Sequence, residues 1–220
     1  MCHTSAVERE YMRNQPMGDA ENYIITINRQ FGSLGRPIAR MLSEKLGIEY
    51  YDREIVDKVA KKLNMPVSEI SELEESANGW LFSMKYPLGM GTTDVQDRIF
   101  KEQKKIIENK ASTESCIIVG RCADAILKDH PNLIRIFIYS PKEKRLEVCV
   151  NEFQMTESEA KRMMLEVDKA RDRYHKQYSG YLPDNLRHID LAVDSSFLGV
   201  EGTVDFLEEY IKKYKEIKSI

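Results

Sequence analysis

The chain has 220 residues, of which 42% are hydrophobic, and this is enough for the core of one large globular domain. A net charge of −3 argues against general attraction to nucleic acid or to an anionic membrane, and no apolar run is long enough to cross a bilayer. From the same charge balance we expect a small-molecule partner. The four cysteines follow no C-x-x-C or metal-ligand spacing, so we expect reduced thiols and a cytoplasmic location.

A strand, a glycine turn and a helix start follow one another near the beginning of the chain. Residues 23–27 form an apolar, β-branched run typical of a central parallel strand, and apolar residues recur at helical spacing from Ile38 onward. Between them, Gly32 and Gly35 let the backbone turn its amides toward one point, and Pro37 suits the first position of a helix. Such a helix end favours an anion, so we expect a polyphosphate there. The alternative is a glycine-containing turn that binds nothing.

This turn departs from the standard phosphate-loop pattern G-x-x-x-x-G-K-[ST]. Gly35 matches the second glycine, but Gln30 stands where the first belongs. Arg36 replaces the lysine and can still pair with phosphate oxygens, even through two parallel hydrogen bonds. Pro37 replaces the hydroxyl residue that usually contacts Mg²⁺, and Ser33 lies on the other side of the turn. The sequence therefore leaves the protein ligands of a metal ion open.

The rest of the chain alternates between strands and helices. We expect further strands over 48–51, 115–119, 133–139 and 188–194. We expect helices over 55–63, 66–77, 94–109, 141–153, 156–177 and 200–214. Several of these helices have cap candidates, namely Thr92 or Thr93, Ser140 before Pro141, and the capping box that begins at Thr156. The aromatic and glycine-rich residues 78–91 are interpreted as a lid or a loop that covers a pocket.

Polar residues follow two of the predicted strands. Asp52 and Arg53 come directly after the second strand, and Gly120 and Arg121 end the third. In an open parallel sheet the ligand lies beyond the carboxyl ends of the strands, so these residues would share a crevice with the glycine turn. Asp52 is either a helix cap or a carboxylate that orients an acceptor. Arg53 is either an ion-pair partner or a clamp on an acceptor phosphate.

Basic residues crowd the predicted helix over 156–177, where they alternate with acidic ones. An ordinary solvated helix face with ion pairs would show the same pattern. Phosphoryl transfer, however, needs cations around the transferring group, and a helical hairpin above a phosphate loop can deliver them. We therefore take Arg171 and Arg173 as candidate lid residues, and we expect the segment 142–177 to move as a lid.

Five motifs occur in order and at compatible distances along the chain. They are TINRQFGSLGR at 26–36, LGIEYYDRE at 46–54, IIVGRCAD at 117–124, IFIY at 136–139 and DKAR at 168–171. Together they resemble the cytidylate-kinase-like family of P-loop proteins, over nearly the whole chain after the first residues. This resemblance implies an α/β protein with the three-layer P-loop NTPase fold, in which a parallel sheet is flanked by helices and carries a helical lid.

The resemblance also implies a domain organisation and a set of site residues. Residues 1–21 would be a loose tail and 22–220 a single kinase-like domain, with an acceptor-side helical region at about 52–112 and a lid at about 142–177. The donor phosphates of ATP would be held by Gly32, Ser33, Gly35 and Arg36. The acceptor would be faced by Asp52, Arg53 and Arg121. The lid would contribute Arg145, Arg171 and Arg173, and the candidate catalytic residues are Arg36, Arg171 and Arg173.

The leading interpretation is ATP-dependent phosphoryl transfer to a small acceptor, with Mg²⁺ and without a side-chain nucleophile. CMP and dCMP are the candidate acceptors, although Cys122 stands where cytidylate kinases have an aspartate after the glycine and arginine. Two alternatives stay open: a catalytically silent nucleotide-binding sensor or interaction protein, and a kinase that acts on a non-nucleotide metabolite. The sequence does not indicate an oligomeric state.

Overall fold

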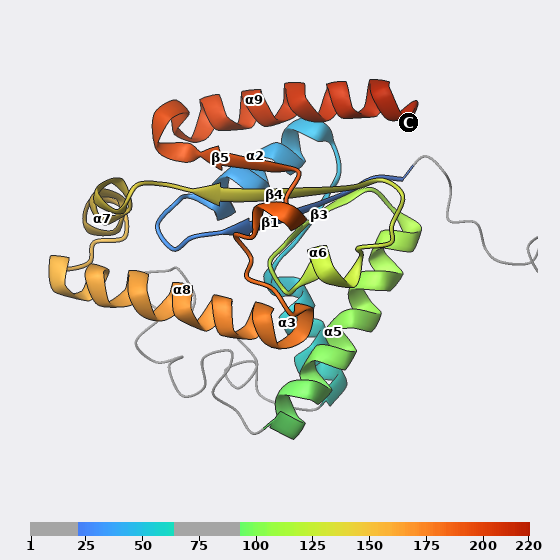
Figure 1. The fold of residues 1–220 in the computed structure, drawn as a ribbon, viewed down its shortest axis with the longest axis horizontal. Coiled ribbons are helices and arrows are strands. Elements are labelled where there is room, and N and C mark those ends of the chain that lie inside the picture. Colours follow the sequence, from blue (N-terminus) through green and yellow to red (C-terminus); the bar gives the residue numbers. More distant parts are fainter. Residues whose placement is uncertain (1–21, 64–92) are drawn as a thin grey trace, which may run out of the picture.

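The computed structural model describes residues 22–63 and 93–220 (Figure 1). Its centre is a sheet in the order β2-β3-β1-β4-β5, and every strand pairs in parallel with its neighbours. The strands are β1 (Ile24–Arg29), β2 (Glu49–Tyr51), β3 (Cys116–Val119), β4 (Leu133–Tyr139) and β5 (Leu191–Asp194). Because all five strands run parallel, their carboxyl ends lie at the same edge of the sheet, and the central β1 ends between its neighbours β3 and β4.

Helices cover both faces of this sheet. They are α2 (Gly35–Leu46), α3 (Arg53–Leu63), α5 (Thr93–Thr113), α6 (Ala123–Ile126), α7 (Lys142–Asn151), α8 (Glu157–Ser179), the 3₁₀ helix η1 (Leu186–His188) and α9 (Ser195–Lys218). In Figure 1, α2 and α9 lie on one face, whereas α3, α5, α6 and α8 lie on the other. The predicted three-layer α/β arrangement is confirmed.

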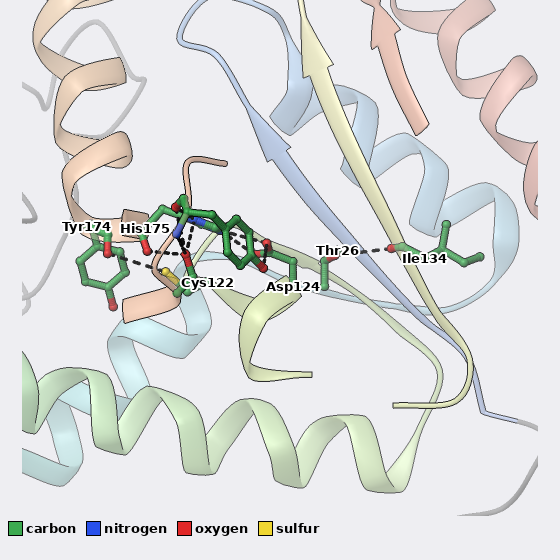
Figure 2. Close-up of polar contacts among 8 residues, drawn as sticks. Thr26, Cys122, Asp124, Ile134, Tyr174 and His175 are labelled. Atoms are coloured by element: carbon green, nitrogen blue, oxygen red, sulfur yellow. Dashed lines mark hydrogen bonds and ion pairs between the residues drawn. The ribbon is translucent and has the colours of Figure 1, made fainter. Parts of the chain in front are cut away.

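The alternation of side chains along β1 explains the two hydrophobic cores. Ile25 and Ile27 are fully buried in the cluster that packs against α2 and α9. Ile24 is fully buried in the opposite cluster, against α3, α5 and α6. Successive strand residues point to opposite faces, so a strand that is apolar on both faces must be covered on both. Thr26, also buried, donates a hydrogen bond to the carbonyl of Ile134 at 3.5 Å (Figure 2).

A helical hairpin made of α7 and α8 packs beside the glycine turn. The predicted capping box is confirmed: the Glu159 amide donates to the Thr156 hydroxyl at 3.3 Å, and the Thr156 amide donates to the Glu159 carboxylate at 3.0 Å. The core of the hairpin includes the fully buried ring of Phe31 from the turn. The N-cap of α7 is Pro141 rather than Ser140. The hairpin and the turn thus share one small core.

Three boundaries differ from the sequence expectation. Pro37 is the third residue of α2, not the first, because Leu34 caps the helix in a left-handed conformation. The proline fits there because the first-turn amides of a helix have no intrahelical partner. The last strand begins only at Leu191, since Arg135 donates its backbone amide and guanidinium to the Asp190 carboxylate at 2.8 to 3.0 Å. Helix α9 starts directly after β5 and is broken at Gly199.

Some expectations fall outside the described residues. These are the tail 1–21, the helix 66–77, the loop 78–91 and the cap candidate Thr92; the other cap candidate, Thr93, is the first residue of α5, and its side chain is not among those described. Within the described residues, Cys116, Cys122 and Cys149 are buried and form no disulfide bond. No helix in the described part of the chain is long and apolar enough to cross a membrane.

Candidate functional site

The two glycines of the turn allow close packing on either side of it. Gly32 has a φ of +77°, and a Cβ atom built on it would lie 3.0 Å from the Arg145 carbonyl oxygen and 3.0 Å from the Cys149 sulfur. A Cβ atom on Gly35 would lie 2.7 Å from the Cβ atom of Arg29. Gly32 therefore supplies a left-handed turn against α7, whereas Gly35 gives room to the side chain that ends β1.

The side chain of Ser33 stabilises this turn from inside. Its hydroxyl donates to the carbonyls of Gln30 at 2.9 Å and Ile138 at 3.2 Å. Its own carbonyl accepts a hydrogen bond from the Ser195 hydroxyl at 2.7 Å. Ser33 is almost completely buried, its hydroxyl is bonded inside the turn and its amide donates to the Gln30 carbonyl at 3.4 Å, so Ser33 shapes the turn rather than offering its hydroxyl to a ligand.

Asp52 is the carboxylate that contacts both Arg36 of the glycine turn and Arg121 of the turn after β3. Its Oδ2 atom lies 2.5 Å from Nε of Arg36 and accepts a hydrogen bond from the Tyr50 hydroxyl at 3.2 Å. Its Oδ1 atom lies 3.5 Å from Nη2 of Arg121. Burial raises the pKa of this carboxyl, but the charges of Arg121, Arg36 and Arg29 outweigh burial and lower its pKa to about 2. Asp52 is therefore ionised at neutral pH and orients two arginines.

The hairpin is fastened to the turn by a second carboxylate, Asp168 of α8. Its Oδ1 atom accepts a hydrogen bond from the Phe31 amide at 2.7 Å, and its Oδ2 atom lies 2.5 Å from Nη1 of Arg145. The same Arg145 nitrogen donates to the Phe31 carbonyl at 3.1 Å. One turn further along α8, Arg171 donates to the carbonyl of Arg29 at 3.1 Å. Two of the three predicted lid arginines thus lie beside the turn.

A family model, the cytidylate kinase-like family, matches residues 24–197, which is most of the chain. The chain belongs to the cytidylate kinase-like family. Two curated relatives support this: cytidylate kinases of Methanococcus vannielii and Methanopyrus kandleri, both 25% identical to this chain. The alignments cover 86% of this chain in both cases, and 99% and 92% of the relatives. An uncharacterized protein from Eubacterium ventriosum has a similar structure, with a TM-score of 0.67 and 29% identity over 87% of this chain and 99% of that one.

Family membership makes this chain a kinase with the P-loop NTPase fold, which carries out phosphoryl transfer to a small acceptor.

Four residues at or near the site were not identified as site residues from the sequence, namely Arg29, Asp168, Asp124 and His175. Arg29 is buried at the end of β1, and a Cβ atom on Gly120 would lie 2.7 Å from its Nη1 atom. The sequence signal that could have identified it is an arginine at the end of an apolar strand, just before the glycine turn.

A small pocket of about 20 Å³ lies among these side chains at the carboxyl edge of the sheet. Its lining comes from the end of β1, the turn after β3, one face of α8 and the segment between α8 and η1, namely Asn28, Arg29, Gly120, Arg121, Cys122, Arg171, Tyr174, His175 and Pro183. This volume is about that of one water molecule. Arginine side chains fill the space, so a phosphate group would have to displace them.

For two further predicted site residues, Arg173 and Arg53, the structure shows no side chain beside the glycine turn or the pocket. Arg173 is exposed, and its Nε atom donates to the Lys169 carbonyl at 3.3 Å, on the side of α8 away from the pocket. The structure therefore does not bring Arg173 together with Arg171. Arg53 begins α3, directly after Asp52, but its side chain is not among those described.

The described residues do not fit a magnesium site held by the protein. Pro37 and Ile38 have no hydroxyl, and the Ser33 hydroxyl is bonded to two carbonyls. Within residues 22–63 and 93–220, no group of three or more His, Cys, Asp or Glu side chains could hold a metal ion. A magnesium ion would then be bound mainly by the phosphates of a nucleotide, as this ion often is.

Proposed function

We propose that this kinase transfers the γ-phosphoryl group of ATP to CMP or dCMP. The observation that carries the proposal is the position of Asp52, which binds Arg36 from the glycine turn and Arg121 from the turn after β3, on the proposed acceptor side. The named relatives, both cytidylate kinases, support the choice of acceptor.

On the donor side, the backbone of the turn between Gly32 and Arg36 would bind the phosphates of ATP. The turn leads directly into α2, whose amino end favours negative charge. Arg36 lies in the first turn of this helix and is partly exposed, so its guanidinium can contact a phosphate while Asp52 holds its Nε atom. Arg145, which binds the Phe31 carbonyl, would add a second cation from the hairpin.

On the acceptor side, Arg121 would bind the phosphate of the monophosphate. Its side chain is almost completely buried and is oriented by Asp52 at 3.5 Å. Gly120, at the end of β3, gives Arg29 room to approach from β1. A guanidinium held between a carboxylate and a pocket is well suited to orient an anionic acceptor.

During the reaction, an acceptor phosphate oxygen would form a bond to the γ-phosphorus while the bond to the β,γ-bridging oxygen breaks. The acceptor oxygen is already anionic, so no side chain has to remove a proton. Arg171, which lines the pocket and binds the Arg29 carbonyl, would stabilise the charge on the transferring group. The arginines thus act by positioning and by electrostatic stabilisation.

The proposal is tested by incubating the purified protein with ATP, Mg²⁺ and a panel of nucleoside monophosphates and small metabolites. ADP release and the mass of the product are both measured. We expect CDP or dCDP as the main product. Phosphorylation of only a non-nucleotide metabolite would overturn the choice of acceptor, and ATP binding without any turnover would favour a silent nucleotide-binding protein.

A further inference from the structure

A buried ion pair joins α8 to α6 behind the pocket. The Nε2 atom of His175 lies 2.9 and 3.0 Å from the two carboxylate oxygens of Asp124, and both side chains are 4% exposed. Figure 2 shows the two side chains directed toward each other. The phosphoryl transfer proposed above does not use either group directly.

Both ring nitrogens of His175 face acceptor oxygens. Its Nδ1 atom lies 2.8 Å from the Tyr181 carbonyl and 2.9 Å from the Ser179 hydroxyl, while Nε2 faces Asp124. That hydroxyl can donate its proton to the His175 carbonyl at 2.7 Å or to the Tyr181 carbonyl at 3.0 Å. A doubly protonated imidazole donates to Asp124 on one side and to the Tyr181 carbonyl on the other. A neutral ring protonated at Nε2 keeps a hydrogen bond to Asp124 but loses its charge beside the carboxylate, and its Nδ1 atom can then only accept, from the Ser179 hydroxyl.

The charged and titratable groups around this pair come from several elements. Asp124 also accepts hydrogen bonds from the Tyr181 hydroxyl, at 3.1 Å, and from the side chain of Asn28 in β1. Asp172 adds negative charge from α8 itself, and His188 of η1 stacks on the Tyr181 ring with centroids 3.8 Å apart. Burial lowers the pKa of His175, but Asp124 and the other acceptors outweigh it and raise this pKa above its ordinary value.

The pair lies where it can set the distance between two proposed site residues. His175 follows Arg171 by one turn on the same face of α8, and both line the pocket. Asp124 lies in the first turn of α6 and follows Arg121 by three residues, and Arg121 lies in the turn that leads from β3 into α6. A second contact, between the Cys122 sulfur and the Tyr174 carbonyl at 4.0 Å, spans the same two elements (Figure 2).

We propose that the Asp124–His175 pair is a positioning element that holds Arg171 of α8 in register with Arg121. This inference rests on the proposed function for the roles of the two arginines, but the docking of α8 is a property of the protein without substrate. Deprotonation of His175 would loosen that docking, so turnover and protection of α8 would both fall at alkaline pH.

The experiment compares the full-length wild type with His175→Gln and Asp124→Asn from about pH 6 to about pH 9. Amide hydrogen exchange of α8, corrected for the intrinsic pH dependence of exchange, is measured without ligand, and kcat and KM for ATP are measured with CMP. His130→Gln is the control, since this histidine precedes β4 at the opposite edge of the sheet. Asp124→Asn keeps a group that can hydrogen-bond a neutral imidazole while it removes the buried charge.

We expect the wild type to lose protection in α8 and to lose kcat as His175 deprotonates, and the control to behave like the wild type. Asp124→Asn should lose this pH dependence. His175→Gln should lower kcat about tenfold or more at pH 7, with a much smaller change in KM for ATP, because a misplaced arginine mainly affects the transition state.

Two results would overturn the inference: α8 protection in the wild type that does not change with pH, or an Asp124→Asn variant that keeps the wild-type pH dependence. If His175→Gln fails to fold, the pH dependence of α8 protection in the wild type and in Asp124→Asn still shows whether the ion pair holds α8 in place. If no acceptor is phosphorylated, the proposed function fails, but the exchange data still test the docking of α8 separately.

Discussion

The Nε atom of Arg36 lies 2.5 Å from Oδ2 of Asp52, and this contact joins the start of α2 to the end of β2. Arg36 was assigned to the donor phosphates from the glycine turn, and Asp52 to the acceptor from its place after a strand. The structure brings both into one ion pair. A phosphate that binds at either side will therefore change the electrostatic environment of the other side.

Arg36→Ala should weaken ATP binding by about tenfold, which corresponds to about 1.4 kcal/mol, because a guanidinium near phosphate is lost. Calorimetric titration with ATP measures this directly. Arg40→Ala is the matched control: Arg40 lies one turn further along α2, is exposed and pairs with Glu44 at 3.2 Å. Equal ATP affinities for wild type and Arg36→Ala would show that the donor site is assigned to the wrong residues.

Asp52 should make the protein sensitive to acid. Its pKa is lowered from 3.8 to about 2 in the folded state, so its contribution to stability is present above the unfolded pKa and is lost as pH falls through the folded one. The shift corresponds to about 2 kcal/mol. Urea unfolding of wild type and Asp52→Asn should differ most near pH 6 and converge between about pH 4 and about pH 2. A constant difference over this range would contradict the prediction.

Gly35→Ala should lower both stability and activity. The new Cβ atom would lie 2.7 Å from Cβ and 3.0 Å from Cγ of Arg29, so either the turn or Arg29 must move. We expect a loss of about 1–3 kcal/mol in the free energy of unfolding, as overpacking usually costs. Gly47→Ala is the control, since a Cβ atom there meets nothing within 4 Å. Its φ of +65° predicts a loss of about 1 kcal/mol with unchanged turnover. A fully active Gly35→Ala variant would show that this packing is dispensable.

The sequence predicts the sheet well because its strands are short β-branched runs with simple patterns. It also predicts Asp52 and Arg121, since residues that follow parallel strands meet at one edge. The contacts that α8 makes with the glycine turn and with α6 could not be predicted. The Phe31 amide and Asp168 are 137 residues apart in sequence, and Asp124 and His175 are 51 apart. Such pairs depend on how α8 packs across the sheet, which the periodicity of the helix alone does not determine.

The hairpin 142–177 was expected to move as a lid, and this stays a prediction. Asp168 and Arg171 bind it to the turn through backbone contacts, and the ring of Phe31 is buried in its core. Amide exchange in this segment should slow when ATP and CMP are present together, because phosphates would hold Arg145 and Arg171. Unchanged exchange at saturating concentrations of both would argue for a rigid hairpin.

The most direct test of the central claim compares phosphoryl transfer to CMP by wild type and Arg121→Ala, together with the ATP affinity of both. Arg187→Ala, which changes an exposed arginine of η1, is the control. The claim that Arg121 binds the acceptor while the glycine turn binds the donor predicts that Arg121→Ala lowers kcat/KM for CMP at least a hundredfold and changes the Kd for ATP less than about threefold. Equal loss of both quantities, or full activity of Arg121→Ala with CMP, would contradict it.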